Sequence, residues 1–185
     1  MARNGVGGNG GANGRSRRSA AVYLWDNSLY IATGLIGAWI CLQVHWVLAI
    51  IQLAASILGP LWIMTRVCPT CLLYGSAACP SGYGLVSKRL VDRGDPDKFR
   101  EVFSLHVTAV APMWFIPIGA VGYLLLTGEP VPWLVVILFI VVAFVGVPLK
   151  SRYYTCARCP KRADCPWGSR AALPPSSRSG NGRQG

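Results

Sequence analysis

The chain has 185 residues, of which 52% are hydrophobic and 14% are charged. This length suits one compact domain and excludes a large soluble core with separate catalytic domains. The formal net charge of +11 would fit a nucleic-acid ligand. The basic residues, however, lie beside long apolar blocks, so we interpret them as membrane-topology signals and expect no nucleic-acid partner.

Four apolar segments follow in chain order, each about as long as a helix that crosses a bilayer core of about 30 Å. They are Tyr23–Leu42, Trp46–Met64, Val102–Leu126 and Pro132–Leu149. The first is the weakest, because Asp26 and Asn27 interrupt it, and we expect it to begin in the headgroup layer. The sequence predicts an all-α membrane protein with four transmembrane helices.

Turn residues divide these segments into two hairpins. The three residues 43–45 are expected to close the first hairpin, and residues 127–130 (Thr-Gly-Glu-Pro) the second. Trp46 and Trp133 would then lie at the same membrane interface, where indole rings are enriched.

The third segment has a predicted start and two predicted kinks. Asp95 is expected to cap the helix, with Pro96 in its first turn. Pro112 and Pro117 lack the amide hydrogen that a continuous helix needs, so we expect them to bend it.

The distribution of charge predicts the orientation. All 18 Lys and Arg residues lie in the N-terminal tail, between Arg66 and Arg100, or from Lys150 onward, and the two hairpin turns contain none. By the positive-inside rule, both termini and the middle loop are predicted to face the cytoplasm, in a multi-pass protein of the cell membrane.

The two halves of the sequence resemble copies of each other. The matched positions are Gly37-Ala38 with Gly119-Ala120, Trp46 with Trp133, Pro60-Leu61 with Pro148-Leu149, and a Cys-x2-Cys pair eight residues after each of these prolines. A third Cys follows after seven residues in the first half and five in the second. We therefore predict two duplicated helical hairpins, arranged as parallel repeats, each followed by a cytoplasmic three-cysteine motif.

This duplication predicts the organisation of the chain. The expected parts are a disordered basic tail (1–20), repeat 1 (21–82), a charged cytoplasmic linker (83–101), repeat 2 (102–168) and a disordered tail (169–185).

Six of the seven cysteines belong to these motifs: Cys68, Cys71, Cys79, Cys156, Cys159 and Cys165. Cys41 lies within a membrane segment, where we expect it to act as a small apolar packing residue. Disulfides are disfavoured in the reducing cytoplasm, and nearby Arg and Lys residues favour thiolates. Two Cys-x2-Cys pairs in one small protein indicate metal binding.

The ligand set leaves the metal open. Pairing Cys68 and Cys71 with Cys156 and Cys159 would make a four-thiolate zinc site, but the third cysteine of each motif would have no role. Three thiolates in each half suit a [4Fe-4S] cluster with a fourth ligand from elsewhere. His106 is the candidate for that extra ligand. We favour iron-sulfur over zinc, with redox-active thiols as a third alternative.

Four membrane helices with Cys-Pro steps at Cys68, Cys79, Cys159 and Cys165 resemble the membrane-bound ferredoxin-type subunits that pass quinol electrons in nitrate and nitrous-oxide respiration. Those subunits carry Cys-x3-Cys-Pro motifs and an appended two-cluster ferredoxin domain. Here the pattern is Cys-x2-Cys with a later Cys-Pro, and no ferredoxin domain follows within the 185 residues. The resemblance covers architecture more than motif, and it implies an electron-transfer role.

The favoured hypothesis is an integral membrane iron-sulfur protein that relays electrons between a partner protein and quinone. No P-loop, dinucleotide fingerprint or HExxH motif is present, which favours an electron-transfer subunit of a membrane complex over a stand-alone enzyme. The alternative is a non-enzymatic scaffold in which zinc holds the two cysteine segments together. Its basic tails would recruit a partner or anionic membrane lipid.

Overall fold

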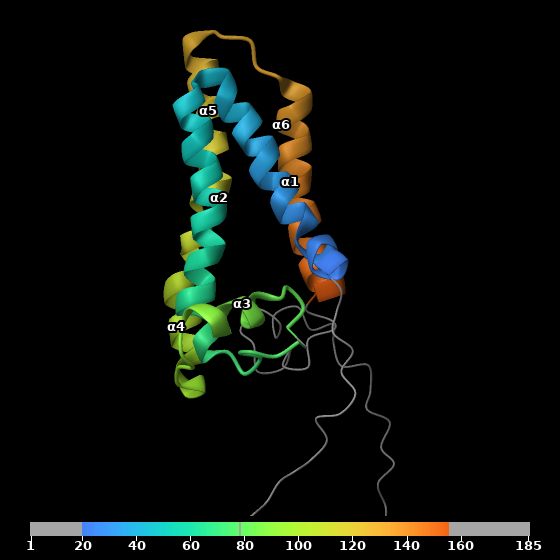
Figure 1. Ribbon diagram of the computed structural model, residues 1–185. Coiled ribbons are helices and arrows are strands. Elements are labelled where there is room, and N and C mark those ends of the chain that lie inside the picture. The colour runs from blue at the N-terminus through green and yellow to red at the C-terminus, as the bar shows by residue number, and fades with distance from the viewer. Residues whose placement is uncertain (1–19, 78, 156–185) are drawn as a thin grey trace, which may run out of the picture.

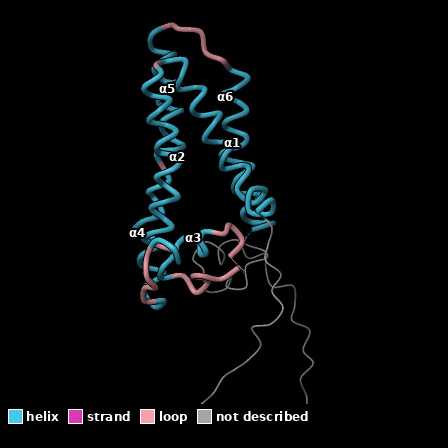
Figure 2. The backbone as a smooth tube through the Cα atoms, viewed as in Figure 1, coloured by secondary structure: helices cyan, strands magenta, loops and turns pink. Residues whose placement is uncertain are grey.

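The computed structural model describes residues 20–77 and 79–155, which form helices and turns without a strand. The elements are α1 (Ala20–Val44), α2 (Trp46–Arg66), η1 (Cys68–Thr70), α3 (Tyr83–Leu90), η2 (Pro96–Lys98), α4 (Phe99–His106), η3 (Val107–Val110), α5 (Pro112–Thr127), α6 (Trp133–Ile140), η4 (Val141–Gly146), α7 (Val147–Lys150) and η5 (Ser151–Thr155). Figure 2 shows the long helices side by side, with most of the loop residues gathered at one end.

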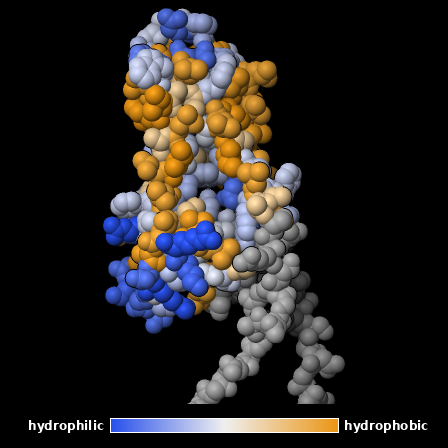
Figure 3. Space-filling model, in the orientation of Figure 1, coloured by the Kyte–Doolittle hydropathy of each residue, from blue (hydrophilic) through white to orange (hydrophobic). Residues whose placement is uncertain are grey.

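Four helical stretches are long and apolar enough to cross a membrane. They are Ala20–Val44, Trp46–Thr70, Pro96–Thr127 and Trp133–Tyr154. Most of their apolar side chains are exposed, and they form a band between two hydrophilic ends in Figure 3. An exposed apolar band of this kind is suited to lipid contact. For the described residues, the prediction of an all-helical protein with four helices long and apolar enough to span a membrane is therefore confirmed.

The first helix is longer than the sequence suggested. Asp26 and Asn27 do not interrupt α1, which is continuous from Ala20 to Val44. The polar side chain of Asn27 is accommodated because its amide donates to the carbonyl of Tyr23 within the helix and to that of Ser81 in the following loop. At the other end, a single residue separates α1 from α2, not three: His45 caps α2, its Nδ1 accepting from the amide of Val47 at 3.2 Å.

The third span is segmented. Asp95 caps η2 as predicted, accepting from the amide of Asp97 at 3.0 Å, and Pro96 lies in the first turn. A short 3-10 stretch, η3, interrupts the α-helix just before Pro112. Pro117 lies inside α5 without ending it. The fourth span is also irregular, because η4 and η5 are π-helical.

Helix α1 is the centre of the packing. It contacts α2, α5, α6 and η4, whereas α6 makes little contact with α5, its neighbour in sequence. Figure 1 shows α1 starting beside the end of the last span and crossing obliquely to meet α2 at the opposite end. The two halves are thus packed unequally, and the duplication stays a prediction from the sequence.

Small residues allow α1 and α2 to approach closely, as in many membrane helix pairs. A Cβ atom added at Gly34 would lie 3.0 Å from Ser56 Oγ, and one added at Gly37 would lie 2.8 Å from both Gln52 Nε2 and Pro117 Cγ. Around this contact lies the buried core, formed by Ile40, Cys41, Ala49, Ala120, Val136, Phe139 and Ala143.

Both described ends of the chain and the loop between α2 and α4 lie at one end of the bundle (Figure 1). Lys150 connects the last span to the first: its Nζ donates to the carbonyl of Trp25 and, at 3.0 Å, to Ser28 Oγ, and it lies 4.8 Å from the centre of the Trp25 ring. The described end of the last span therefore lies beside the start of α1.

Candidate functional site

The first cysteine motif forms a chain of tight turns directly after α2. Cys68 begins η1, where Pro69 sets the backbone for the first turn, and the amide of Cys71 donates to the carbonyl of Cys68 at 3.1 Å. The amide of Cys79 donates to the carbonyl of Ser76 at 3.2 Å. The Cys-x2-Cys pair thus encloses one turn, the local geometry that lets two sulfur atoms face one ion.

Backbone contacts hold this loop against α3. The amide of Gly75 donates to the carbonyl of Gly84 at 2.9 Å. Gly84 packs so closely that an added Cβ would lie 2.6 Å from the carbonyl oxygen of Leu73. On the other side, Asn27 of α1 donates to the carbonyl of Ser81 at 3.1 Å. The motif is therefore fixed between the first helix and α3.

Further hydrogen bonds connect the loop to the segment that follows α3. Tyr74 Oη donates to the carbonyl of Val91 at 2.6 Å, and the amide of Gly94 donates to the carbonyl of Pro69 at 3.1 Å. These contacts give the cysteine loop a defined conformation.

Tyr83 lies close to two of the thiols. Burial, and then the charge that Cys68 and Cys79 would carry as thiolates, raises the pKa of Tyr83 to about 12. The phenol is therefore a neutral hydrogen-bond donor at physiological pH. Cys79 Sγ also lies 3.7 Å from Ser81 Oγ, a weak hydrogen-bond contact.

The three described cysteines of this motif are half-buried. Within residues 20–77 and 79–155, however, no group of three or more His, Cys, Asp or Glu side chains is placed to hold a metal ion. Cys156, Cys159 and Cys165 lie outside the described residues. The first motif thus presents preformed turns, but its own side chains do not complete a metal site.

His106, the predicted extra ligand, lies against a tryptophan. Its Nδ1 accepts from Trp62 Nε1 at 3.3 Å, with the two rings at 69°, and the guanidinium of Arg66 lies 5.2 Å from the Trp62 ring centre. This contact joins α4 to the end of α2. Cys41 is buried in the membrane core of the bundle, as expected for a packing residue.

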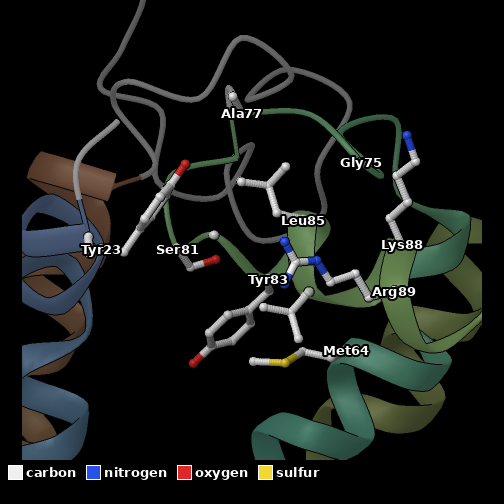
Figure 4. A pocket seen from close by; sticks show the side chains of 12 residues that line it. Tyr23, Met64, Gly75, Ala77, Ser81, Tyr83, Leu85, Lys88 and Arg89 are labelled. Atoms are coloured by element: carbon white, nitrogen blue, oxygen red, sulfur yellow. The ribbon is translucent and has the colours of Figure 1, made fainter. Parts of the chain in front are cut away.

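A pocket adjoins the cysteine loop, and no sequence pattern predicted it. It has a volume of about 1030 Å³ and lies between the start of α1, the end of α2 and α3. Figure 4 shows its lining residues, which are Ala20, Tyr23, Met64, Gly75, Ala77, Ser81, Gly82, Tyr83, Leu85, Val86, Lys88 and Arg89. It forms because α1 and α2, which meet at His45, diverge toward the cysteine loop (Figure 1).

Sequence reasoning also missed Gln52, which is completely buried in the middle of α2. Its position inside a long apolar segment was a usable signal, because polar side chains in membrane helices face protein partners.

No family model matches the chain, and the searches of curated proteins and of solved structures found no match either.

Proposed function

We propose that this multi-pass membrane protein holds a cysteine-ligated iron-sulfur cluster at its cytoplasmic end and transfers electrons between a partner protein and the quinone pool. One observation carries the proposal: the described residues that lead into the two cysteine segments lie at the same end of the bundle (Figure 1). Helix α2 leads directly to Cys68, and η5 ends at Thr155, one residue before Cys156. This arrangement supports a common site that takes ligands from both segments.

The arrangement of the described cysteines favours one site shared by both cysteine segments over a separate cluster in each half of the chain. The turn at Cys68–Cys71 is formed, but the first motif does not gather three ligands by itself. A cluster would therefore take sulfur atoms from both segments, drawn from Cys68, Cys71, Cys79, Cys156, Cys159 and Cys165. A [4Fe-4S] cluster in this position would supply one-electron transfer.

The surrounding residues would support such a centre. Half-burial of the first three cysteines limits their exposure to water, and exclusion of solvent is one way in which proteins tune a cluster's potential. Tyr83, kept neutral by its raised pKa, would offer a hydrogen-bond donor near Cys68 and Cys79.

The cytoplasmic orientation and the partners are part of the proposal. The concentration of Lys and Arg at the loop end supports cytoplasmic cysteines. A quinone and a redox partner protein, met within a membrane complex, are supported by the resemblance to respiratory ferredoxin-type subunits.

Metal analysis tests the proposal. Protein purified without oxygen should contain iron and acid-labile sulfide, and the reduced form should give a paramagnetic resonance signal. Cys68→Ser and Cys156→Ser should each lose most of the iron, because each removes a ligand of the shared site. Cys41→Ser is the matched control, since Cys41 lies in the membrane core, and it should retain the iron. Iron-free protein with stoichiometric zinc would reject the proposal.

The second candidate function is a zinc-held scaffold. It is favoured by the first Cys-x2-Cys turn, which closes without a third convergent ligand in the described part of the chain. Two such turns would make the four-thiolate set of a structural zinc site. In that case, Cys79→Ser and Cys165→Ser would retain the metal, whereas Cys68→Ser and Cys156→Ser would lose it.

A further inference from the structure

We propose that the pocket between α1, α2 and α3 binds the phosphate-bearing headgroup of an anionic phospholipid. The pocket adjoins the cysteine loop and shares Ser81 and Tyr83 with the surroundings of the proposed metal centre, but lipid binding there does not require a bound metal.

The pocket lies at the level of lipid headgroups. Trp25 and Trp62 are exposed at the loop end of the spans, and Trp46 and Trp133 are exposed at the other end. Trp46 and Trp62 are 16 positions apart in α2. At a rise of about 1.5 Å per residue, they are about 24 Å apart along the helix, compared with about 30 Å for a bilayer's hydrocarbon core.

The lining residues lie just beyond this aromatic boundary. Ala20 and Tyr23 precede Trp25, and Met64 follows Trp62. Tryptophan rings prefer the interface itself, so groups slightly farther out meet phosphates and glycerol rather than acyl chains.

The charge of the pocket selects an anion. Its two charged lining residues, Lys88 and Arg89, are both basic, and no Asp or Glu lines it within the described part of the chain. Neither basic side chain has a hydrogen bond or an ion pair with any other described residue. Figure 4 shows the guanidinium of Arg89 reaching over the pocket between Leu85 and Tyr83. Guanidinium groups form bidentate hydrogen bonds with phosphate oxygens.

The start of α3 adds to this preference. Gly82 and Tyr83 line the pocket, and no side chain caps the helix there. The first amides of a helix favour negative charge. Cationic side chains and an open helix start therefore act on the same cavity.

The remaining walls suit the rest of a lipid. Met64, Leu85 and Val86 are apolar and lie beside polar Ser81 and Tyr23. A free phosphate ion would leave these apolar walls in contact with water, whereas a diacylglycerol phosphate would cover them with its glycerol and first methylene groups. The mixed lining thus favours an amphiphile over an inorganic anion.

Lipid retention and thermal unfolding of the full chain in detergent test the site. The probes are phosphatidylglycerol, phosphatidylcholine and inorganic phosphate, titrated separately, with bound lipid counted by native mass spectrometry. We expect selective binding and stabilisation by phosphatidylglycerol. Replacing both basic residues, Lys88→Gln with Arg89→Gln, should weaken this binding by roughly tenfold or more, given typical contributions of basic residues to anionic-lipid binding.

Two comparisons make the result specific. Lys98→Gln with Arg100→Gln removes the same charge from η2 and α4, outside the pocket. It should change the affinity less than about twofold if the effect is local rather than long-range. Ala77→Leu adds bulk to the lining without changing charge, and it should also weaken binding. Equal losses in the two charge variants, no preference over phosphatidylcholine, or equal stabilisation by inorganic phosphate would each overturn the proposal.

Discussion

The side-chain amide of Gln52 donates a hydrogen bond of 2.9 Å to the backbone carbonyl of Met113. In a regular helix, that carbonyl would accept from the amide of residue 117, but residue 117 is proline and has no N–H group. Gln52 of α2 therefore satisfies an acceptor that α5 cannot satisfy itself. Water is not available at this depth in a bilayer, so the partner has to come from another helix.

Replacing this glutamine should destabilise the bundle. Gln52→Leu removes the donor and should lower the free energy of unfolding by about 1 kcal/mol, the usual scale of hydrogen bonds between membrane helices. The loss should shrink when Pro117→Ala is also introduced, because residue 117 then supplies its own amide. Thermal unfolding of the two single variants and the double variant, compared as a cycle, measures this coupling.

The control for that cycle is Gln43→Leu. Gln43 is exposed, and its amide donates only to the carbonyl of Trp39 in the same helix, at 3.4 Å. Gln43→Leu should therefore change the free energy of unfolding very little. If the effects of Gln52→Leu and Pro117→Ala on the free energy of unfolding are strictly additive, the Gln52 amide does not replace the missing backbone amide of residue 117.

A second prediction compares Gly37 and Gly119, which occupy matched positions in the two halves of the sequence. Gly37→Ala would place a methyl group 2.8 Å from Gln52 Nε2 and Pro117 Cγ, whereas Gly119 has nothing within 4 Å of an added Cβ. Gly37→Ala should therefore destabilise the fold by roughly 1–3 kcal/mol, as overpacking usually does. Gly119→Ala should be neutral or slightly stabilising, because it lowers the entropy of the unfolded chain. Unfolding midpoints of both variants check this, and a similar loss in both would be inconsistent with the observed packing.

Alkaline pH should weaken the contact of α3 with the cysteine loop. Free tyrosine has a pKa near 10, whereas burial and then the two neighbouring thiols raise the pKa of Tyr83 to about 12. The folded state therefore prefers the neutral phenol. This contribution to stability is fully present below about pH 10 and is lost as the pH rises toward about 12.

The measurement is the unfolding midpoint at pH 9 and pH 11.5, with tyrosinate absorbance as a direct readout of ionisation. Tyr83→Phe should reduce the difference between the two midpoints. The matched control is Tyr123→Phe, at an exposed position of α5, which should leave the difference as it is in the wild-type protein. If both variants behave alike, Tyr83 is not the group that responds.

The shared position of the two cysteine segments can be checked by thiol labelling. In single-cysteine variants that retain only Cys68 or only Cys156, a membrane-impermeant reagent should label neither in intact cells and both after permeabilisation. The two thiols are expected on one side because two candidate spans lie between Cys68 and Cys156, and on the cytoplasmic side because the Lys and Arg residues are concentrated there. Labelling of one position in intact cells would place the two segments on opposite sides.

The four spans were predictable because long apolar blocks leave few alternatives to membrane helices. The extent of α1 was less predictable: Asp26 and Asn27 interrupt the apolar run but lie within a continuous helix, because a polar side chain at a helix end can find a partner in a loop far away in sequence, here Ser81. Which helices pack side by side could not be predicted either. Whether α6 contacts α1 or α5 depends on side-chain shape in three dimensions, not on hydropathy.

The candidate site was predictable only as a set of residue types. Cysteine spacing indicated turns, and the turn at Cys68–Cys71 is formed, but spacing could not show which thiols converge. The pocket had no sequence signal, since it is created by the divergence of α1 and α2 and its lining comes from four separate stretches of the chain.

Since only His45 joins α1 to α2, we expect these two helices to enter the bilayer as a closed hairpin. The end of α1 and the start of α2 are held together by the short connection, so the surface that carries Gly37 and Gln52 can form from residues 20–66 alone. During synthesis, a docking surface for α5 would then exist before α5 itself has been made.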